Sequence, residues 1–203
     1  GTASVLIDCL VQAGVPEGVV SLVVGPTSTT YDVLMKSPVV RKVSLTGSSG
    51  VGQQMLRDAA GTFKRATMEL GGNAPVIVFD DAQLDATLDI VAAVKFANAG
   101  QVCVTGDRFY VHESLYSKFV DGFASRAKAL KLGHGLDDTT QMGPLINAKR
   151  VAAIDAVVAD ARKRGGRIVT GGEQPSDKNK GFFYSPTVIA DLPDESLALA
   201  EEN

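Results

Sequence analysis

The sequence has no tryptophan, two cysteines and two histidines among its 203 residues. Two cysteines cannot make a multi-bridge disulfide scaffold, and nothing in the sequence requires an oxidising compartment. We therefore expect a cytoplasmic protein. The cysteines and histidines are scattered without the spacing of metal ligands, so we predict no metal site.

The sequence also has no excess of basic residues and no long run of apolar residues. Lys and Arg total 20 against 23 Asp and Glu, and the net charge of −3 offers nothing to hold a phosphate backbone, which excludes nucleic acid as a partner. The longest aliphatic run, Val19 to Val24, is interrupted by Ser21 and is far shorter than the roughly 20 residues of a membrane helix. No apolar signal segment opens the chain, so we expect no membrane association.

What is present suits a folded core, since 45% of the residues are hydrophobic and 21% charged. Short β-branched runs alternate with helical patterns, which predicts an α/β fold of parallel sheets with helices on their faces. The expected strands are 19–24, 39–45, 64–70, 75–79, 108–112, 167–170 and 183–189, and the expected helices are 5–13, 31–36, 51–60, 84–97, 114–130 and 148–164. Glycines at 71 and 72 separate two β-rich segments and predict a boundary between residues 1–72 and 73–203. The first helix has no preceding strand, and the last helical start, near Pro193, has no end, so we expect both ends to be cuts in a longer chain.

A glycine-rich turn joins an expected strand to an expected helix in the segment Leu45-Thr46-Gly47-Ser48-Ser49-Gly50-Val51-Gly52. Such a turn presents free backbone N–H groups and the positive end of a helix dipole, which together favour an anion such as phosphate. The segment has neither the lysine of a P-loop nor the G-x-G-x-x-G dinucleotide pattern, so a plain tight turn with a serine cap stays open.

Two further residues could carry chemistry. Glu69 ends an expected strand against two glycines, where it is either a partly desolvated general base or a solvated strand-end carboxylate. Cys103 lies in a Gly-flanked turn whose N–H groups could stabilise a thiolate and hold an oxyanion, unless it is only a small buried residue. Cys9, on the apolar face of the first helix, is expected to be inert core.

These three segments together resemble the motifs of the aldehyde dehydrogenase superfamily. The matching segments are Leu45-Thr46-Gly47-Ser48, Met68-Glu69-Leu70-Gly71-Gly72-Asn73 and Asn98-Ala99-Gly100-Gln101-Val102-Cys103. Their order agrees with the family, as does the spacing of 34 residues from Glu69 to Cys103 (103 − 69). Further matches extend the likeness over the chain, at Gly143-Pro144-Leu145-Ile146, Gly171-Gly172 and Pro186-Thr187.

The resemblance implies a partial Rossmann-like α/β fold, with the later part of the dinucleotide-binding domain in residues 1–72 and most of the catalytic domain in residues 73–203. It implies oxidation of a small-molecule aldehyde to a carboxylic acid with NAD or NADP, in a full-length protein that is a homo-oligomer, a dimer or a tetramer. By the same resemblance Cys103 attacks the aldehyde, and Glu69 activates the water that hydrolyses the resulting thioester. The residues implied in cofactor binding are Thr46, Gly47, Ser48, Val51, Leu70 and Glu202.

Within the family, the segment Val40-Arg41-Lys42-Val43-Ser44, residues 69–81 and Lys95-Phe96 resemble the succinate-semialdehyde dehydrogenase branch, which makes a semialdehyde a candidate substrate. That branch has an arginine for the substrate carboxylate where this chain has Ala97. It also has members with a second cysteine where this chain has Thr105.

Two other hypotheses remain. The chain could be a catalytically silent truncated module, which micromolar NAD binding by the 203-residue chain would contradict, and we expect the isolated segment to be inactive. It could also be a Cys–His hydrolase with His112 or His134 as the base, which ester hydrolysis lost on changing either histidine would favour.

Overall fold

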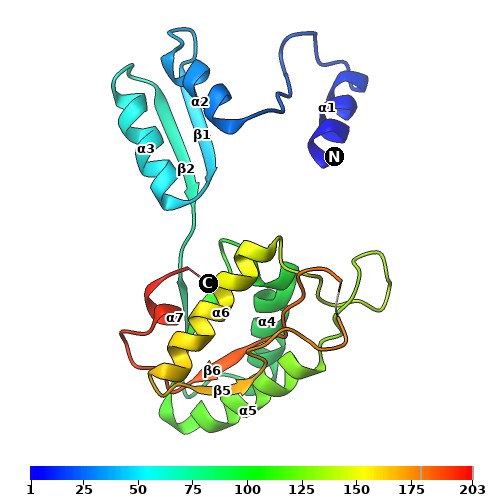
Figure 1. Cartoon of the computed structure of the whole chain (residues 1–203), viewed down its shortest axis with the longest axis vertical. Helices are drawn as coiled ribbons and strands as arrows, with labels where there is room; N and C mark the ends of the chain where they lie inside the picture. The colour runs from blue at the N-terminus through cyan, green and yellow to red at the C-terminus, as the bar shows by residue number, and fades with distance from the viewer. Residues whose placement is uncertain (179, 203) are drawn as a thin grey trace. The chain divides into compact units, whose positions relative to one another are not determined.

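The chain divides into two compact units, Gly1–Leu70 and Gly71–Asn203. The structure is a computed structural model that describes residues 1–178 and 180–202 (Figure 1). The division falls two residues (72 − 70) before the boundary predicted from the two glycines.

The first unit is built on a pair of parallel strands joined by a helix. Strands β1 (Lys42–Gly47) and β2 (Arg65–Leu70) pair in parallel, and α3 (Ser49–Ala60) makes the crossover between them. Helices α1 (Thr2–Gln12) and α2 (Thr27–Lys36) precede this sheet. Its small core is formed by Met35, Val43 and Ala59, one residue each from α2, β1 and α3. Apolar burial therefore holds the crossover helix on the strand pair.

Two expectations for the first unit are wrong. The run Val19–Val24 forms no strand, and its valines at 23 and 24 are 70% and 87% exposed. A strand needs a neighbour to take its backbone hydrogen bonds, and no described segment pairs with this run. Helix α1 forms, but none of its residues is buried and Cys9 is exposed, so Cys9 is not a core residue.

The second unit contains two separate strand pairs. Strands β3 (Ala74–Val78) and β4 (Gly106–Val111) are parallel, whereas β5 (Arg167–Thr170) and β6 (Val188–Ala190) are antiparallel. The helical elements are α4 (Leu84–Phe96), the short 3-10 turn η1 (Ala97–Gly100), α5 (Glu113–Ala129), α6 (Ala148–Lys163) and α7 (Leu197–Ala200). The parallel arrangement expected throughout thus holds for β3 and β4 but not for β5 and β6. The strand expected at 183–189 is also shorter than predicted, since β6 covers only Val188–Ala190.

Aromatic rings fix the end of α4 to β4 and α5. Phe96 stacks on Phe123 with ring centroids 5.7 Å apart, and Phe109 lies 5.0 Å from Phe123. Phe119 completes the group at 5.7 Å from Phe123. Because α4 ends and β4 begins on either side of the segment that carries Cys103, this core sets the two anchor points of that segment.

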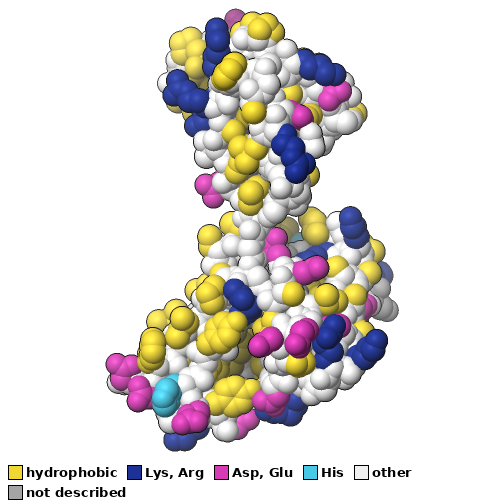
Figure 2. All heavy atoms as spheres, turned by 90° about the vertical axis from the view of Figure 1, so that its left-hand side faces the viewer, with side chains coloured by type: hydrophobic (Ala, Val, Ile, Leu, Met, Phe, Trp, Pro, Cys, Tyr) yellow, Lys and Arg dark blue, Asp and Glu magenta, His cyan; other side chains and the backbone are white. Residues whose placement is uncertain are grey.

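Apolar side chains also reach the surface of both units (Figure 2). Exposed examples are Val5, Leu6, Val33, Ile77, Phe79 and Ile90. Among the described helices, none combines the length and apolar character needed to cross a bilayer.

Candidate active site

The glycine motif and the glutamate motif meet at one edge of the first unit. In the ladder between β1 and β2, Thr46 is opposite Glu69 and Gly47 is opposite Leu70. Both pairs stand at the carboxyl ends of parallel strands, the edge where ligands of open α/β sheets are bound. Glu69 is exposed there, while Leu70 is half-buried.

The N-terminus of α3 follows directly after this edge. Ser48 is the N-cap residue and makes no side-chain capping bond, and no acidic residue stands in the first turn. The first intrahelical bond runs from Gly52 N–H to the Ser48 carbonyl, which leaves the N–H groups of Ser49, Gly50 and Val51 without an intrahelical partner. These donors and the helix dipole favour a negatively charged group.

Gly52 lets Leu70 approach α3 closely. A Cβ atom at position 52 would lie 2.6 Å from Cδ2 of Leu70, closer than such atoms can be. The glycine is buried, and its missing side chain is what brings the helix and the strand end together. The third glycine of the motif thus has a packing role.

Cys103 lies in a loop that leaves α4 through a left-handed turn. Asn98 and Ala99 have φ values of 51° and 57°, and Gly100 has a φ of 76°. A non-glycine residue in this region costs on the order of 1–2 kcal/mol, and such strain persists only where the surroundings enforce it.

Two amide side chains hold that turn in shape. Asn98 Nδ2 donates to the Gln101 carbonyl and Gln101 Nε2 donates to the Asn98 carbonyl, both at 3.1 Å. The other end of the Gln101 amide, Oε1, accepts from the backbone N–H of Ile146 at 2.9 Å. The loop is therefore closed on itself and tied to the segment Gly143-Pro144-Leu145-Ile146.

Cys103 is exposed, so the alternative of a buried small residue is wrong. Its own N–H and that of Val104 donate to no acceptor within the described residues. The following residue, Thr105, is almost completely buried, and its hydroxyl donates to the Val94 carbonyl of α4 at 3.2 Å. An accessible sulfur beside unpaired N–H donors is the arrangement that holds a developing oxyanion.

The end of the chain is attached to the start of β3. Asn73 Nδ2 donates to the carbonyl oxygens of Ala198 and Glu201, at 3.3 and 2.7 Å. A Cβ atom at Gly71 would overlap the carboxylate of Glu202, so a side chain at position 71 would displace that carboxylate. The predicted site residue Glu202 is thus held against the Gly-Gly segment that follows β2.

The hydrogen bonds given for the two histidines within the described residues are local, and none of them is to Cys103. His112 is the N-cap of α5, and its Nδ1 lies 2.9 Å from Ser114 Oγ. Cys103 precedes β4 and His112 follows it, so the six residues of the strand, about 20 Å, separate them. Nδ1 of His134 accepts from the Leu136 N–H. No group of three His, Cys, Asp or Glu side chains that could hold a metal occurs among residues 1–178 and 180–202.

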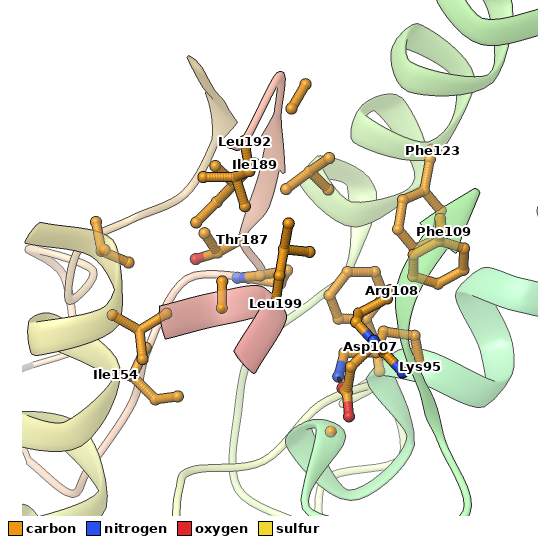
Figure 3. Close-up of a pocket in the computed structure, with 18 of the residues that line it drawn as sticks. Lys95, Asp107, Arg108, Phe109, Phe123, Ile154, Thr187, Ile189, Leu192 and Leu199 are labelled. Carbon is orange, nitrogen blue, oxygen red and sulfur yellow. Dashed lines mark hydrogen bonds and ion pairs between the residues drawn. The ribbon is translucent and has the colours of Figure 1, made fainter. Parts of the chain in front are cut away.

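The second unit contains a cavity of about 410 Å³ (Figure 3). Ala99, Gly100 and Gln101, which precede Cys103, are among its lining residues. Its walls come from β4, β6, α5, α6 and α7 and are mainly apolar. Lys95 and Asp107 form an ion pair at its edge. Tyr184 also lines it, and burial together with a bond to Asp155 raises the pKa of the Tyr184 phenol, so it remains a neutral donor. Cys103 itself does not line this cavity.

Several residues that shape the site had no supporting role assigned to them in the sequence analysis. These are Asn98 and Gln101 as loop locks, Thr105 as a tie to α4, the Lys95–Asp107 pair and Asn73. The motif spacing marked the first two, but their hydrogen-bond partners depend on the folded chain.

Comparison with protein-family models matches residues 1–203 to the aldehyde dehydrogenase family. The chain is 40% identical over 201 residues to a succinate semialdehyde dehydrogenase of Acinetobacter baylyi and 42% identical over 202 residues to the mitochondrial succinate-semialdehyde dehydrogenase of Arabidopsis thaliana. Each alignment covers 99% of this chain, but only 41% and 38% of the relatives.

Solved structures give the same result. An NADP-dependent enzyme of E. coli is 40% identical with a TM-score of 0.94, covering 98% of this chain and 41% of that one. A betaine aldehyde dehydrogenase of Staphylococcus aureus in complex with NAD+ is 33% identical with a TM-score of 0.92, covering 99% of this chain and 40% of that one.

Proposed function

Because the chain belongs to the aldehyde dehydrogenase family, we propose that the protein oxidises an aldehyde to a carboxylic acid with NAD or NADP. The observation that carries this proposal is Cys103, an exposed thiol in a loop locked by Asn98 and Gln101, with its own N–H unpaired among the described residues. In this proposal residues 1–72 belong to the dinucleotide-binding domain and residues 73–203 to the catalytic domain.

The first unit has the features that a dinucleotide requires. The free N–H groups at the start of α3 suit a pyrophosphate, and no carboxylate in its first turn opposes one. We assign the cofactor to Thr46, Gly47, Ser48, Val51 and Leu70, with Glu202 on a ribose hydroxyl. When bound, the nicotinamide supplies an acceptor for the hydride of the aldehyde carbon.

Cys103 supplies the nucleophile. Its thiolate attacks the aldehyde carbonyl carbon to give a thiohemiacetal, and the carbonyl oxygen becomes an oxyanion. The Cys103 N–H can donate to that oxygen without giving up another bond, since no described group accepts from it. Oxidation of the carbon then leaves a thioester on Cys103.

Glu69 supplies the base for the second half of the reaction. Its carboxylate takes a proton from water, the water oxygen attacks the thioester carbonyl, and the carbon–sulfur bond breaks. The carboxylic acid leaves and the Cys103 thiolate is regenerated. The position of Glu69 at an exposed strand end, with Gly71 and Gly72 following, supports access of water to the carboxylate.

A semialdehyde is the first substrate to test. Relatives at 37–42% identity are named succinate- or glutarate-semialdehyde dehydrogenases. Ala97, however, offers only an exposed methyl group where that branch has an arginine, so a substrate carboxylate must find its cation elsewhere. We also propose that the full-length protein is a homo-oligomer.

The decisive experiment measures reduction of NAD+ and NADP+ by the full-length protein with succinate semialdehyde, glutarate semialdehyde or acetaldehyde. We expect Cys103→Ala to lower the rate at least about 10³-fold, because the nucleophile is lost. Cys9→Ala, in the other unit, is the matched control and keeps wild-type activity. Aldehyde oxidation that persists unchanged in Cys103→Ala rules the proposal out.

A further inference from the structure

The loop that carries Cys103 is fastened at its base by two side-chain links from α4, one to Thr105 just before β4 and one to Asp107 within β4. One is the hydrogen bond from Thr105 Oγ1 to the Val94 carbonyl. The other is the ion pair between Lys95, in the last turn of α4, and Asp107, the second residue of β4 (Figure 3). Residues 97–104 all belong to the stretch of chain that both links close.

The ion pair is shielded from water. The Asp107 side chain is 5% exposed and that of Lys95 is 20% exposed. A carboxylate in such surroundings is strongly unfavourable without a partner, so the two side chains hold each other in place. The other ion pairs from α4 among the described residues join Asp85 and Asp89 to Arg126, and these two aspartate side chains are 95% and 70% exposed.

The left-handed turn rests on the lysine. A Cβ atom at Gly100 would lie 3.3 Å from the Lys95 carbonyl oxygen, 3.5 Å from its Nζ and 3.6 Å from its Cε. Gly100 therefore lies beside Lys95, so a change in where the Lys95 side chain lies can reach Gly100 and its neighbours.

We propose that Lys95 and Asp107 are positioning residues that hold the Cys103 loop in its reactive conformation. This inference rests on the proposed function, in which Cys103 is the nucleophile. The ion pair fixes the Lys95 side chain, the fixed side chain supports the strained turn at Asn98 and Ala99, and the turn sets the direction of the N–H groups that follow it. Lys95 and Asp107 need not touch the substrate to do this.

The test compares three variants of the 203-residue chain. Lys95→Met/Asp107→Leu replaces the pair by apolar groups, which keeps the fold because no buried charge is left unpaired. Lys95→Arg keeps the ion pair, and Asp89→Asn, the matched control, removes one of the two exposed ion pairs on the same helix. Thermal unfolding of each variant verifies that the fold is retained.

Loop order is read by site-resolved amide hydrogen exchange. The amides of Gln101, Val102 and Thr105 donate to acceptors within the loop, to the carbonyls of Asn98, Gly100 and Val102. In the double variant we expect their protection to fall by about tenfold or more, while amides of α5 keep theirs. Lys95→Arg and Asp89→Asn keep wild-type protection throughout.

Sulfur reactivity is the second readout. Iodoacetamide alkylation of Cys103 is compared by mass spectrometry with that of exposed Cys9, which serves as the internal reference. We expect the Cys103 to Cys9 rate ratio to fall about fivefold in the double variant, because the loop N–H groups no longer face the thiolate.

A pair that merely stabilises the fold gives a different result. The proposal is overturned if a folded double variant keeps wild-type protection of the loop amides and a Cys103 to Cys9 alkylation ratio at or above the wild-type value. It is also overturned if Lys95→Arg loses as much amide protection as the double variant. Neither readout needs catalysis, so a failure of aldehyde oxidation and a failure of loop positioning are seen separately.

Discussion

Thr46 lies directly opposite Glu69 in the parallel ladder between β1 and β2. The glycine motif and the proposed base, distant in the sequence, therefore share one strand edge. This follows from the β1–α3–β2 crossover, which brings the carboxyl ends of both strands to the same side. A proposed contact residue of the cofactor and the residue that would activate water are positioned by the same register.

Replacing Glu69 by Gln separates the two halves of the proposed reaction. Acylation of Cys103 does not use the carboxylate, so the first turnover should give a burst of reduced cofactor equal to the enzyme concentration. Steady-state turnover should then slow by about 10²–10⁴-fold, the usual contribution of a general base. Stopped-flow absorbance measures the burst, and mass spectrometry of the Cys103 peptide detects the trapped acyl group. Glu17→Gln, at an exposed position of the same unit, serves as the control. A Glu69→Gln protein that turns over at the wild-type rate disproves the assignment.

Two alanine substitutions in α3 should have opposite effects on stability. At Gly52 the new Cβ atom meets Leu70 at 2.6 Å, and displacing that side chain should cost about 1–3 kcal/mol. At Gly50 there is open space, and the better helix propensity of alanine should add up to about 1 kcal/mol. Urea unfolding followed by circular dichroism measures both changes. Equal stabilisation by the two substitutions would mean that Gly52 has no packing role.

Acid should weaken the attachment of the last helix. The Leu197 N–H, which donates to Asp160 at 2.9 Å, and then Arg164 lower the pKa of the Asp160 carboxyl. A carboxyl with a lowered folded-state pKa contributes stability above its unfolded value, about 4, and loses that contribution as pH falls through the folded value. Asp160→Asn should therefore lower Tm near pH 6 and flatten the fall of Tm below about pH 4. If Tm of the Asp160→Asn variant falls below about pH 4 as steeply as Tm of the wild type, this account is contradicted.

Most of the secondary structure was predictable, because it follows from local periodicity and turn residues. The expected strand at 167–170 coincides with β5, and the helix expected at 84–97 differs from α4 by one residue. The matching solved structures confirm the partial aldehyde dehydrogenase fold. The run Val19–Val24 forms no strand because a valine-rich run becomes a strand only beside another strand, and no described segment pairs with it.

The site was predictable in its residues but not in its supports. Motif order and spacing brought out Cys103, Glu69 and the glycine turn, and their proposed roles remain predictions. The ties from Asn98 to Gln101 and from Lys95 to Asp107 join residues whose side chains could equally have faced water. Which partner each one takes depends on a loop conformation that periodicity does not encode.

The hydrogen bond between Gln101 and Ile146 determines which amino acids position 146 can accept during evolution. Gln101 Oε1 accepts from the main-chain N–H of Ile146, and this isoleucine is 74% exposed. Selection acting on this bond therefore acts on the presence of an N–H group at that position. Nearly any amino acid can occupy it, and proline alone, which has no N–H, would release the Cys103 loop from the neighbouring segment.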